Sequence, residues 1–400
     1  MGKSIFYVAQ YFTPEPYLKD IQFIKDLERR GWEPVVITGF PNYPKGEIYE
    51  GYTNKWFHEE MMDGIRVIRT YSYSDHSTNS FKRTLNYLVF GVFASLAILK
   101  FGKKSSFYYI LQSSPFVVFC AWVVKLFKGK SKTLLDIQDV FPENIRVSGF
   151  IKSPTVLNIL DWCLDHFYYK FFDYFVTVSE SFKKMVAKKG INEQRILTLY
   201  NWSMVEQQNQ VKSHDFGGDS INIVYAGNIG VHQGLSELAD SIIKLQEKVP
   251  KLKFHFFGDG TDYDILNEKL KGANNSKLYG RVTPEEIGTY LHGADVLFLH
   301  LVKDPVYECI IPSKLQAYIE VGKPILAGLE GEARAFITEY KIGEVFEPEN
   351  SDSFVQACIN ISNYSEEHIL KINEISLNLY KTKFSRKAGA DRLHEFISKI

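Results

Sequence analysis

The chain has 400 residues, which is too long for one ordinary hydrophobic core, so two domains of about 200 residues each are expected. Hydrophobic residues make up 45% and charged residues 24% of the chain, as in folded globular proteins. The 47 basic and 47 acidic residues cancel. This balance argues against nucleic acid as the main partner, because binding to a phosphate backbone needs a basic excess. The four cysteines are scattered without metal-ligand spacing, which predicts a reduced, cytoplasmic environment.

Short apolar runs alternate with amphipathic stretches along the chain, a pattern typical of parallel α/β sheets. The N-terminus lacks the apolar core and cleavage site of a signal peptide, so it is predicted as the first strand, before a helix at 19–30. The strands predicted in the first half are 5–10, 34–38, 108–112, 132–136 and 174–178. Those predicted in the second half are 221–226, 253–257, 276–278, 296–300 and 324–327.

Two apolar segments of the first half are bordered by basic residues. The stretch 85–99 is shorter than the roughly twenty residues that a membrane-spanning helix needs, and 116–127 is shorter still. We expect both to be helices that lie on an anionic membrane surface, with two core helices as the alternative. The bordering residues are Lys82, Arg83, Lys100, Lys103, Lys104, Lys125, Lys128, Lys130 and Lys132.

A polar stretch separates the two series of strands. Residues 206–220 contain three glutamines and a Gly-Gly pair, a composition typical of an interdomain linker. We therefore predict a Rossmann-like domain at 1–203, a linker at 204–219 and a second Rossmann-like domain at 220–384, with the two domains facing a cleft.

The first segment that could carry chemistry is the glycine-rich turn 225–234, between a predicted strand and a helix that starts near Leu235. Glycines let the backbone approach a ligand closely, and the following helix offers amides and a positive dipole end to phosphate. The spacing of the glycines differs from the GxGxxG pattern that binds dinucleotides. The alternative is an ordinary strand–helix turn, which can also use glycine.

The second segment is 256–264, in which Asp262 and Asp264 spell the DxD pattern of metal-dependent sugar transferases. Thr261 is predicted as a helix N-cap, with Asp264 three positions further on. Acidic residues in a first helical turn are favoured by the helix dipole. We therefore interpret the pair as helix capping and expect no metal.

The third segment runs from Glu308 to Pro324. Pro312 suits a first helical turn and Gly322 a helix end, so a helix is predicted at 313–321 with Lys314 in its first turn. A diphosphate at this helix N-terminus would gain amides and a cation together. Glu308, on the preceding loop, could accept hydrogen bonds from sugar hydroxyls, with a solvated surface glutamate as the alternative.

Together these segments resemble the retaining glycosyltransferases of family 4, which have the GT-B fold, and within them the bacterial branch that builds colanic acid, O-antigen and capsule. The resemblance covers essentially the whole chain. It is carried by residues 11–15, 38–44, 136–143, 178–180 and 200–202. Residues from Phe384 onward are similar to the start of a C-terminal helix that crosses back, which assigns 385–400 to the first domain.

The resemblance also implies roles for single residues. The family signature is two glutamates separated by seven residues; Glu308 matches the first, which contacts the donor sugar, and Gln316 stands at the second, which holds the ribose. Asn228 and Gln233 stand where the family often has Arg and Lys, so Lys314 and helix amides must meet the phosphate charge. Asp139 is assigned to orienting the acceptor. The other expected donor-binding residues are Gly227, Gly230, His232, Gly258, Arg281, Val282, Pro312, Ser313 and Leu315.

The expected activity is the transfer of a hexosyl, N-acetylhexosaminyl or fucosaminyl group from a nucleoside diphosphate sugar, with UDP favoured over GDP. The expected acceptor is a polyprenyl-diphosphate-linked sugar at the cytoplasmic face of a bacterial plasma membrane. The configuration is retained and no cofactor is needed. The alternatives are a UDP-sugar 2-epimerase and a non-catalytic scaffold of a polysaccharide-assembly complex.

Overall fold

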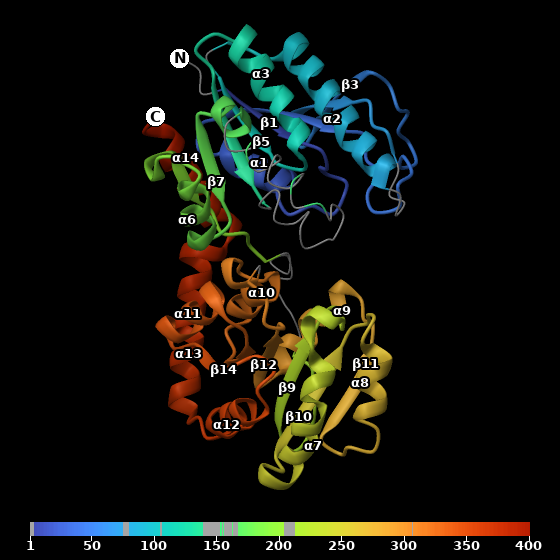
Figure 1. Cartoon of the computed structure of the whole chain (residues 1–400), viewed down its shortest axis with the longest axis vertical. Coiled ribbons are helices and arrows are strands. Elements are labelled where there is room, and N and C mark those ends of the chain that lie inside the picture. The colour runs from blue at the N-terminus through green and yellow to red at the C-terminus, as the bar shows by residue number, and fades with distance from the viewer. Residues whose placement is uncertain are drawn as a thin grey trace. The chain divides into compact units, whose positions relative to one another are not determined.

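The computed structural model describes residues 4–74, 80–104, 106–138, 153, 155, 162, 167–203, 213–305 and 307–400. Contacts divide the chain into two compact units (Figure 1). The N-terminal unit comprises Met1–Leu199 and Ala390–Ile400, and the C-terminal unit comprises Tyr200–Gly389. Each unit is built on its own sheet with helices packed against it, so the predicted α/β class with two parallel-sheet domains is confirmed.

The sheet of the N-terminal unit has eight strands in the order β3-β4-β2-β1-β5-β6-β7-β8. All neighbours are parallel except β3 and β4, which form an antiparallel pair. The strands are β1 Ser4–Ala9, β2 Glu33–Gly39, β3 Phe57–Met62, β4 Ile65–Thr70, β5 Phe107–Leu111, β6 Lys132–Ile137, β7 Tyr174–Thr177 and β8 Ile196–Thr198. Every residue of β1 is buried, as expected for a central strand that is covered on both faces.

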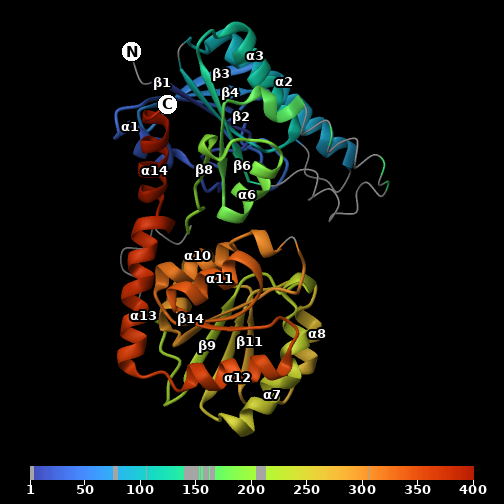
Figure 2. The same ribbon diagram turned by 60° about the vertical axis from the view of Figure 1, so that its left-hand side comes forward.

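Helices connect these strands and cover the sheet. They are α1 Ile21–Glu28, α2 Ser80–Phe101, α3 Val118–Phe127 and α6 Glu180–Lys188, with short 3-10 turns η1 Pro115–Val117, η3 Tyr169–Phe171 and η4 Glu193–Arg195. Residues Ala390–Ile400, which begin within helix α14 Arg386–Ser398, pack beside the end of α1 (Figure 2). There Arg30 pairs with Asp391 at 2.6 Å and the Trp32 indole donates to His394 at 3.0 Å.

Helix α2 is longer than the apolar stretch that predicted it. Its 22 residues include the polar turn before residue 85. Within the part of the chain that the structure describes, Phe81–Phe101 is the one helix long and apolar enough to cross a membrane by length and composition, and 39% of its apolar window is buried in the protein. The expectation that this segment is too short to span a bilayer is therefore wrong on length.

The sheet of the C-terminal unit has six parallel strands in the order β11-β10-β9-β12-β13-β14. The strands are β9 Ile221–Ala226, β10 Leu252–Phe257, β11 Ser276–Gly280, β12 Val296–His300, β13 Ile325–Gly328 and β14 Gly343–Phe346. The helices are α7 Ala239–Lys248, α8 Tyr263–Lys269, α9 Pro284–Gly293, α10 Ser313–Val321, α11 Gly331–Tyr340, α12 Ser351–Ser362 and α13 Glu366–Leu379. The short turns are η5 Val231–Gln233, η6 Leu235–Leu238, η7 Tyr307–Cys309 and η8 Tyr380–Phe384. Two buried apolar clusters, one on each face of the sheet, hold these layers together.

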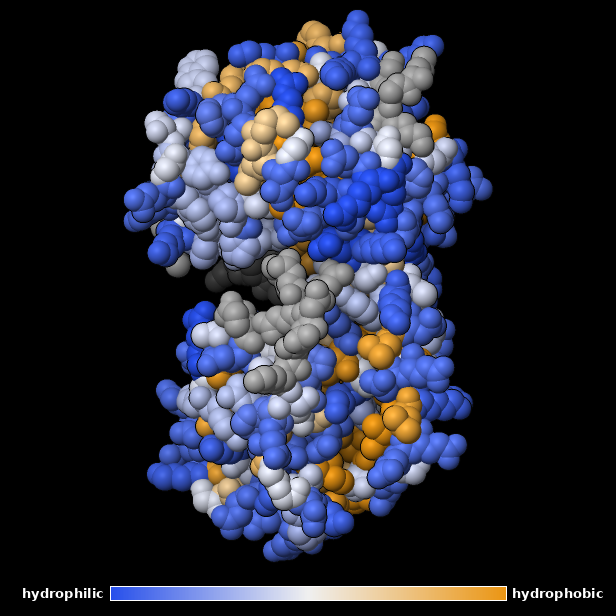
Figure 3. Space-filling view, turned by 180° about the vertical axis from the view of Figure 1, so that it is seen from behind, coloured by the Kyte–Doolittle hydropathy of each residue, from blue (hydrophilic) through white to orange (hydrophobic). Residues whose placement is uncertain are grey.

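The surface seen from behind is mostly hydrophilic, with hydrophobic residues in small groups on both units (Figure 3). Helices α2 and α3 pack against each other, and both views of the ribbon place them side by side on the sheet of the N-terminal unit. They carry seven exposed large hydrophobic side chains. These are Phe81, Val92, Leu96, Leu99, Trp122, Leu126 and Phe127.

Candidate functional site

The three segments singled out in the second half of the sequence, and Arg281 as well, follow the carboxyl ends of neighbouring parallel strands. The glycine-rich turn follows β9, Gly258 follows β10, Arg281 follows β11, and the loop with Glu308 follows β12. Strand order reverses between β9 and β12. In open α/β sheets, ligands bind outside the carboxyl ends of the strands at such a reversal.

A pocket of about 620 Å³ lies at this edge. Five of its lining residues were predicted from the sequence, namely Gly227, Asn228, Gly258, Arg281 and Val282. The others are Phe257, Asp259, Gly260, Thr283 and Ile287. The backbone of two loops, one cation and several apolar side chains therefore meet in one space.

Stacked aromatic rings stand behind the pocket wall. The Phe257 ring stacks on Tyr279 with centroids 4.3 Å apart and on Tyr290 with centroids 4.2 Å apart. Sequence analysis assigned none of these rings, because the stack forms between β10, β11 and α9. The stack supports this side of the pocket from within, and Val282 and Ile287 give the pocket its apolar side chains.

Two glycines bring the loops after β9 and β10 into contact. Gly258 has φ +142°, and a Cβ built on it would lie 1.8 Å from the carbonyl oxygen of Gly227. Gly227 has φ +135°, and its own Cβ would lie 2.4 Å from the Lys314 side chain. Glycine is therefore required at both positions, because the two loops and Lys314 approach one another too closely for a side chain.

Lys314 is mostly buried beside Tyr225, the residue before Ala226 at the end of β9. Its ammonium group lies 4.1 Å from the centroid of the Tyr225 ring and donates to the tyrosine hydroxyl. Burial lowers the pKa of Lys314 from 10.5 to about 7. The predicted helix α10 is confirmed from Ser313 to Val321, but Pro312 is its N-cap rather than part of its first turn.

Asn228 and Gln233 bind to each other rather than standing open. The Asn228 amide donates to Gln233 Oε1 at 3.0 Å, and the backbone amide of Gly230 donates to the same oxygen at 3.1 Å. Gln233 thus closes the turn in which His232 and Gly230 lie, and its carbonyl oxygen contacts His300 Nδ1 at 2.6 Å. None of Gly230, His232 and Gln233 lines the pocket.

Glu308 lies in the turn η7 and its side chain is exposed. Its backbone packs against Gly331, where a Cβ would lie 2.0 Å from the Glu308 carbonyl oxygen. Tyr307, one residue earlier, contacts the His232 ring with centroids 6.0 Å apart, so η7 lies against the glycine-rich turn. Among the described residues, no hydrogen bond or ion pair of the Glu308 carboxylate is found.

Gln316 faces the interior of the unit. Its side chain is 3% exposed, and its amide donates to the Ile311 carbonyl at 3.3 Å, across the loop that leads into α10. This bond fixes the loop that precedes the helix N-terminus. Pro312, Ser313, Leu315 and Gln316 all lie at the start of α10 and none of them lines the pocket.

The predicted cap of the DxD helix is wrong. Helix α8 begins at Tyr263, its N-cap is Asp262, and no side chain caps it. Thr261 therefore lies one position too early to cap the helix. Within the ranges that the structure describes, no cluster of three His, Cys, Asp or Glu side chains could hold a metal ion. Asp139, the predicted acceptor-orienting residue, lies outside the described residues.

Comparison with known families matches residues 206–373 to the glycosyl transferases group 1. This span contains every lining residue of the pocket, together with Glu308 and Lys314.

Relatives named as glycosyltransferases also match. The probable glycosyltransferase WbjE of Pseudomonas aeruginosa is 26% identical over 53% of this chain and 55% of its own, so the chain spans about half of that relative's length. The putative colanic acid biosynthesis glycosyl transferase WcaI of Escherichia coli is 24% identical over 75% of this chain and 76% of its own.

Solved structures share the fold over the whole chain. The Escherichia coli trehalose-6-phosphate structure bound with UDP-2-fluoro glucose covers 100% of this chain and 99% of its own, at a TM-score of 0.71 and 11% identity. Anabaena HepE in complex with UDP and glucose covers 100% of both chains, at a TM-score of 0.62 and 13% identity. The family match over residues 206–373 and the named relatives make the chain similar to the group 1 glycosyltransferases, and its two-sheet architecture is the GT-B fold of the solved structures.

Proposed function

We propose that this protein transfers a sugar from a nucleoside diphosphate donor, with UDP favoured, to a lipid-linked sugar in bacterial surface polysaccharide biosynthesis. The observation that carries the proposal is the position of Lys314. A mostly buried cation stands next to Gly227, a residue of the pocket, at the N-terminus of a nine-residue helix. The name of the relative WcaI, a putative colanic acid biosynthesis glycosyl transferase, supports the polysaccharide context.

The donor is assigned to the C-terminal unit by the chemistry of its pocket. Val282 and Ile287 offer apolar surface to the base, and the glycine loops after β9 and β10 offer backbone groups. The diphosphate lies toward Lys314 and the first amides of α10, where helix dipole and ammonium group act together. No metal is needed, because these groups meet the charge that a divalent ion would otherwise meet.

The proposed chemistry retains configuration at the anomeric carbon. As the bond to the leaving phosphate oxygen breaks, negative charge grows on the diphosphate, and the preorganised amides and Lys314 stabilise it. The acceptor hydroxyl attacks the same face of the sugar, and the departing phosphate oxygen takes its proton. A second carboxylate at short separation is therefore not required.

Glu308 is assigned to the hydroxyl groups of the donor sugar. Its carboxylate is exposed, and its turn η7 lies against the glycine-rich turn through Tyr307 and His232. A carboxylate accepts hydrogen bonds from two neighbouring hydroxyls and strengthens them by its charge.

The membrane is assigned as the place where the acceptor is met. The seven exposed apolar side chains of α2 and α3 border on exposed lysines, among them Lys100, Lys103 and Lys104. Apolar side chains enter the headgroup boundary while lysines meet anionic lipid. Two lysines of the predicted basic set serve the fold instead, because Lys125 pairs with Asp173 at 2.5 Å and Lys128 binds the carbonyls that end α2.

The decisive experiment is a thermal-shift panel of UDP-, GDP- and dTDP-sugars, followed by product analysis with a lipid-linked acceptor extract. We expect one sugar nucleotide to raise the melting temperature and to be consumed only with acceptor present. Consumption of a UDP-sugar without acceptor to give its C2 epimer would favour the epimerase. The absence of any shift would favour a scaffold.

Membrane attachment is tested separately with vesicles that contain anionic lipid. Replacing Lys100, Lys103 and Lys104 with Glu should release the protein, because each lysine near such a surface contributes about 1 kcal/mol. The matched control replaces Lys183, Lys184 and Lys188 of α6, which changes the net charge equally. Equal co-sedimentation of both triple variants would contradict the assignment to α2.

A further inference from the structure

The chain that leads from strand β8 to strand β9 ends in a segment that is docked on the C-terminal unit. Residues 213–217, which we call the strap, enter β9 through Gly217 and Gly218, both of which have a φ of +75°. The Asp215 carboxylate accepts from the Gly217 amide at 2.8 Å and closes this turn. Glycine adopts such a φ without strain, so the turn defines the direction from which the strap enters the sheet.

The backbone of the strap lies against helix α9. The amide of His214 donates to the Thr289 carbonyl at 2.9 Å, near the end of the helix. A Cβ built on Gly293, the last residue of α9, would lie 2.2 Å from the His214 carbonyl oxygen. The strap therefore occupies the space that a side chain at this position of the helix would need.

Two rings of the strap continue the aromatic stack behind the pocket. Phe216 packs on the His255 ring with centroids 4.2 Å apart, and His214 packs on the Tyr290 ring with centroids 4.7 Å apart. His255 Nδ1 lies 2.9 Å from the Tyr279 hydroxyl, within hydrogen-bond distance. Because Tyr279 and Tyr290 are the two flanking rings of the stack, the strap supports it on both sides.

Helix α9 connects the strap to the pocket. Its Ile287 lines the pocket one turn before Tyr290, and its N-cap Thr283 lines the pocket as well. Residues three apart in a helix are neighbours on its surface, so the side chain at the pocket and the ring at the strap lie next to each other. A displacement of the helix end moves both, because a helix of ten residues moves as one rigid element.

The strap also shares a hydrophobic cluster with the pocket. Phe216 packs against the buried core on one face of the sheet, together with Val282, Ile287 and Tyr290. All four side chains are half-buried, so they form the solvent-facing border of a cluster whose interior contains Phe257. Protein interiors are packed as densely as organic crystals, so the loss of one border ring is felt by the others.

We propose that the strap is a positioning element for donor binding, in which Phe216 and His214 hold α9 and the ring stack in the arrangement that accepts the nucleoside diphosphate. The inference rests on the proposed function and deepens it, because it couples occupancy of the pocket to the chain that leads from β8 to β9. None of residues 213–217 lines the pocket, so they act through α9. Donor binding and strap docking then favour each other by the same factor, since coupling between sites is reciprocal.

The test follows the strap by hydrogen exchange in the full chain, with UDP as the probe. In the wild type, saturating UDP should slow exchange of the His214 amide about fivefold or more, as expected for two coupled sites. Gly293→Ala should release the strap, because its Cβ meets the His214 carbonyl oxygen. Its affinity for UDP should fall by the same factor of about five or more.

Deletion of a strap ring gives a second variant that introduces no clash. Phe216→Ala should also weaken UDP binding, and Phe216→Tyr, which keeps the ring, should restore the wild-type affinity. The matched control is Tyr364→Ala. It removes a half-buried ring of the same unit, which stacks on His368 with centroids 4.2 Å apart and does not line the pocket. This control should lower the melting temperature, as Phe216→Ala does, and keep the wild-type affinity for UDP.

Three results would overturn the inference. They are a His214 exchange rate that UDP leaves unchanged, UDP affinities of Gly293→Ala and Phe216→Ala that equal that of Tyr364→Ala, and a Phe216→Tyr variant that binds UDP no more tightly than Phe216→Ala.

The absence of UDP binding to the wild type would instead contradict the proposed function. The nucleotide-free proteins then still decide the inference, because release of the strap should make the amides of α9 exchange faster in Gly293→Ala than in the wild type. Equal exchange rates of α9 in these two proteins would overturn it.

Discussion

The ammonium group of Lys314 lies against the face of Tyr225 and donates to its hydroxyl, although the two residues stand 89 positions apart in the chain. The Tyr225 hydroxyl in turn donates to the Asn228 carbonyl at 2.5 Å. The lysine of α10 is therefore held against the glycine-rich turn. Tyr225, the residue before the last in strand β9, thus positions the cation next to the pocket.

This contact predicts that Lys314 takes up a proton when the donor binds. Burial lowers the pKa of Lys314 to about 7, so at pH 8 most molecules carry it neutral, and a bound diphosphate recharges it by raising that pKa. Calorimetry of UDP binding at pH 8 in two buffers of different ionisation enthalpy should show net proton uptake. The uptake should vanish in Lys314→Met and persist in Lys277→Met, which removes an exposed lysine from the Tyr279 ring. Equal uptake in both variants would contradict the prediction.

Gly258→Ala should abolish UDP binding and destabilise the C-terminal unit. The new Cβ would lie 1.8 Å from the Gly227 carbonyl oxygen, so the two loops of the pocket must separate. The control is Gly272→Ala, which has a positive φ of +82° but no atom within 4 Å of the new Cβ. It should lose only about 1 kcal/mol of the free energy of unfolding and keep the UDP thermal shift. A UDP shift that survives in Gly258→Ala would refute the assignment of these loops.

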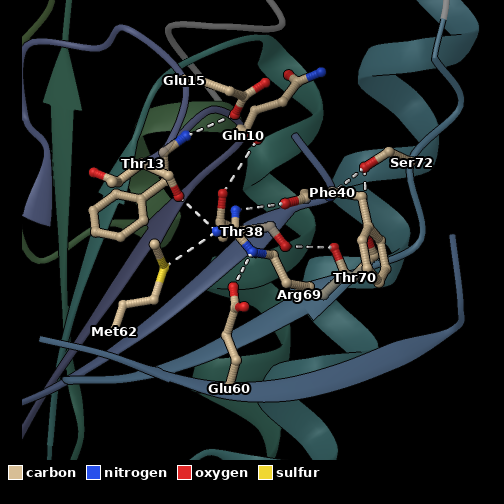
Figure 4. A network of polar contacts seen from close by, with 12 residues as sticks. Gln10, Thr13, Glu15, Thr38, Phe40, Glu60, Met62, Arg69, Thr70 and Ser72 are labelled. Carbon is tan, nitrogen blue, oxygen red and sulfur yellow. Dashed lines mark hydrogen bonds and ion pairs between the residues drawn. The ribbon is translucent and has the colours of Figure 1, made fainter. Parts of the chain in front are cut away.

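Arg69→Met should destabilise the N-terminal unit far more than Arg66→Met. Arg69 is fully buried and binds Glu60 at 2.6 Å (Figure 4), so its removal leaves a carboxylate and two backbone carbonyls without their donor, at a cost of about 3 kcal/mol. Arg66 pairs with Glu59 on the same two strands at 2.6 Å but is 38% exposed, and such a pair contributes up to about 1 kcal/mol. Urea unfolding monitored by circular dichroism measures both. Similar losses in the two variants would show that burial does not set the difference.

We expect the free energy of unfolding to fall in mild acid because of the buried His255. Burial lowers its pKa to about 4, and the ring is held between the Tyr279 hydroxyl at 2.9 Å and Asn222 Oδ1 at 3.1 Å. Since the unfolded chain binds the proton near pH 6.5, the free energy of unfolding should decrease as pH falls from about 6.5 to about 4 and then level off. His255→Gln should flatten this slope, whereas His368→Gln, an exposed position of α13, should leave it as it is. An unchanged slope in His255→Gln would exclude this histidine as the cause.

Most of the fold could be predicted from the sequence, because apolar runs that form buried strands and residues that begin or end helices are local signals. Helix α10 was predicted to the residue, since Pro312 and Gly322 mark its two ends. The hairpin of β3 and β4 was missed because half of the residues of β3 are polar and half are exposed, without an apolar run. Helix α2 extends beyond the apolar stretch 85–99 at both ends, where Lys82, Arg83 and Lys100 interrupt the apolar pattern without ending the helix.

The sequence predicted which loops form the candidate site. It predicted fewer of the contacts that the side chains make there. Gly227, Gly258 and Arg281 line the pocket as expected, because each directly follows a strand of the sheet. The Phe257 stack and the Tyr225 partner of Lys314 depend on which strands become neighbours, which no local pattern encodes. Gln233 looked like a ligand residue, but a short turn has its own unsatisfied amide, and Gln233 closes it.

The end of α14 has a consequence for how this protein is made. Residues Ala390–Ile400 belong to the N-terminal unit, where the indole of Trp32 meets His394 and the Tyr174 ring meets Phe396 at 5.8 Å. A ribosome releases this last segment only after the whole of Tyr200–Gly389 has emerged, so the part translated first is the part completed last. Until residues 390–400 have emerged, the nascent N-terminal unit lacks this segment, whereas the unit Tyr200–Gly389 is contiguous in the chain.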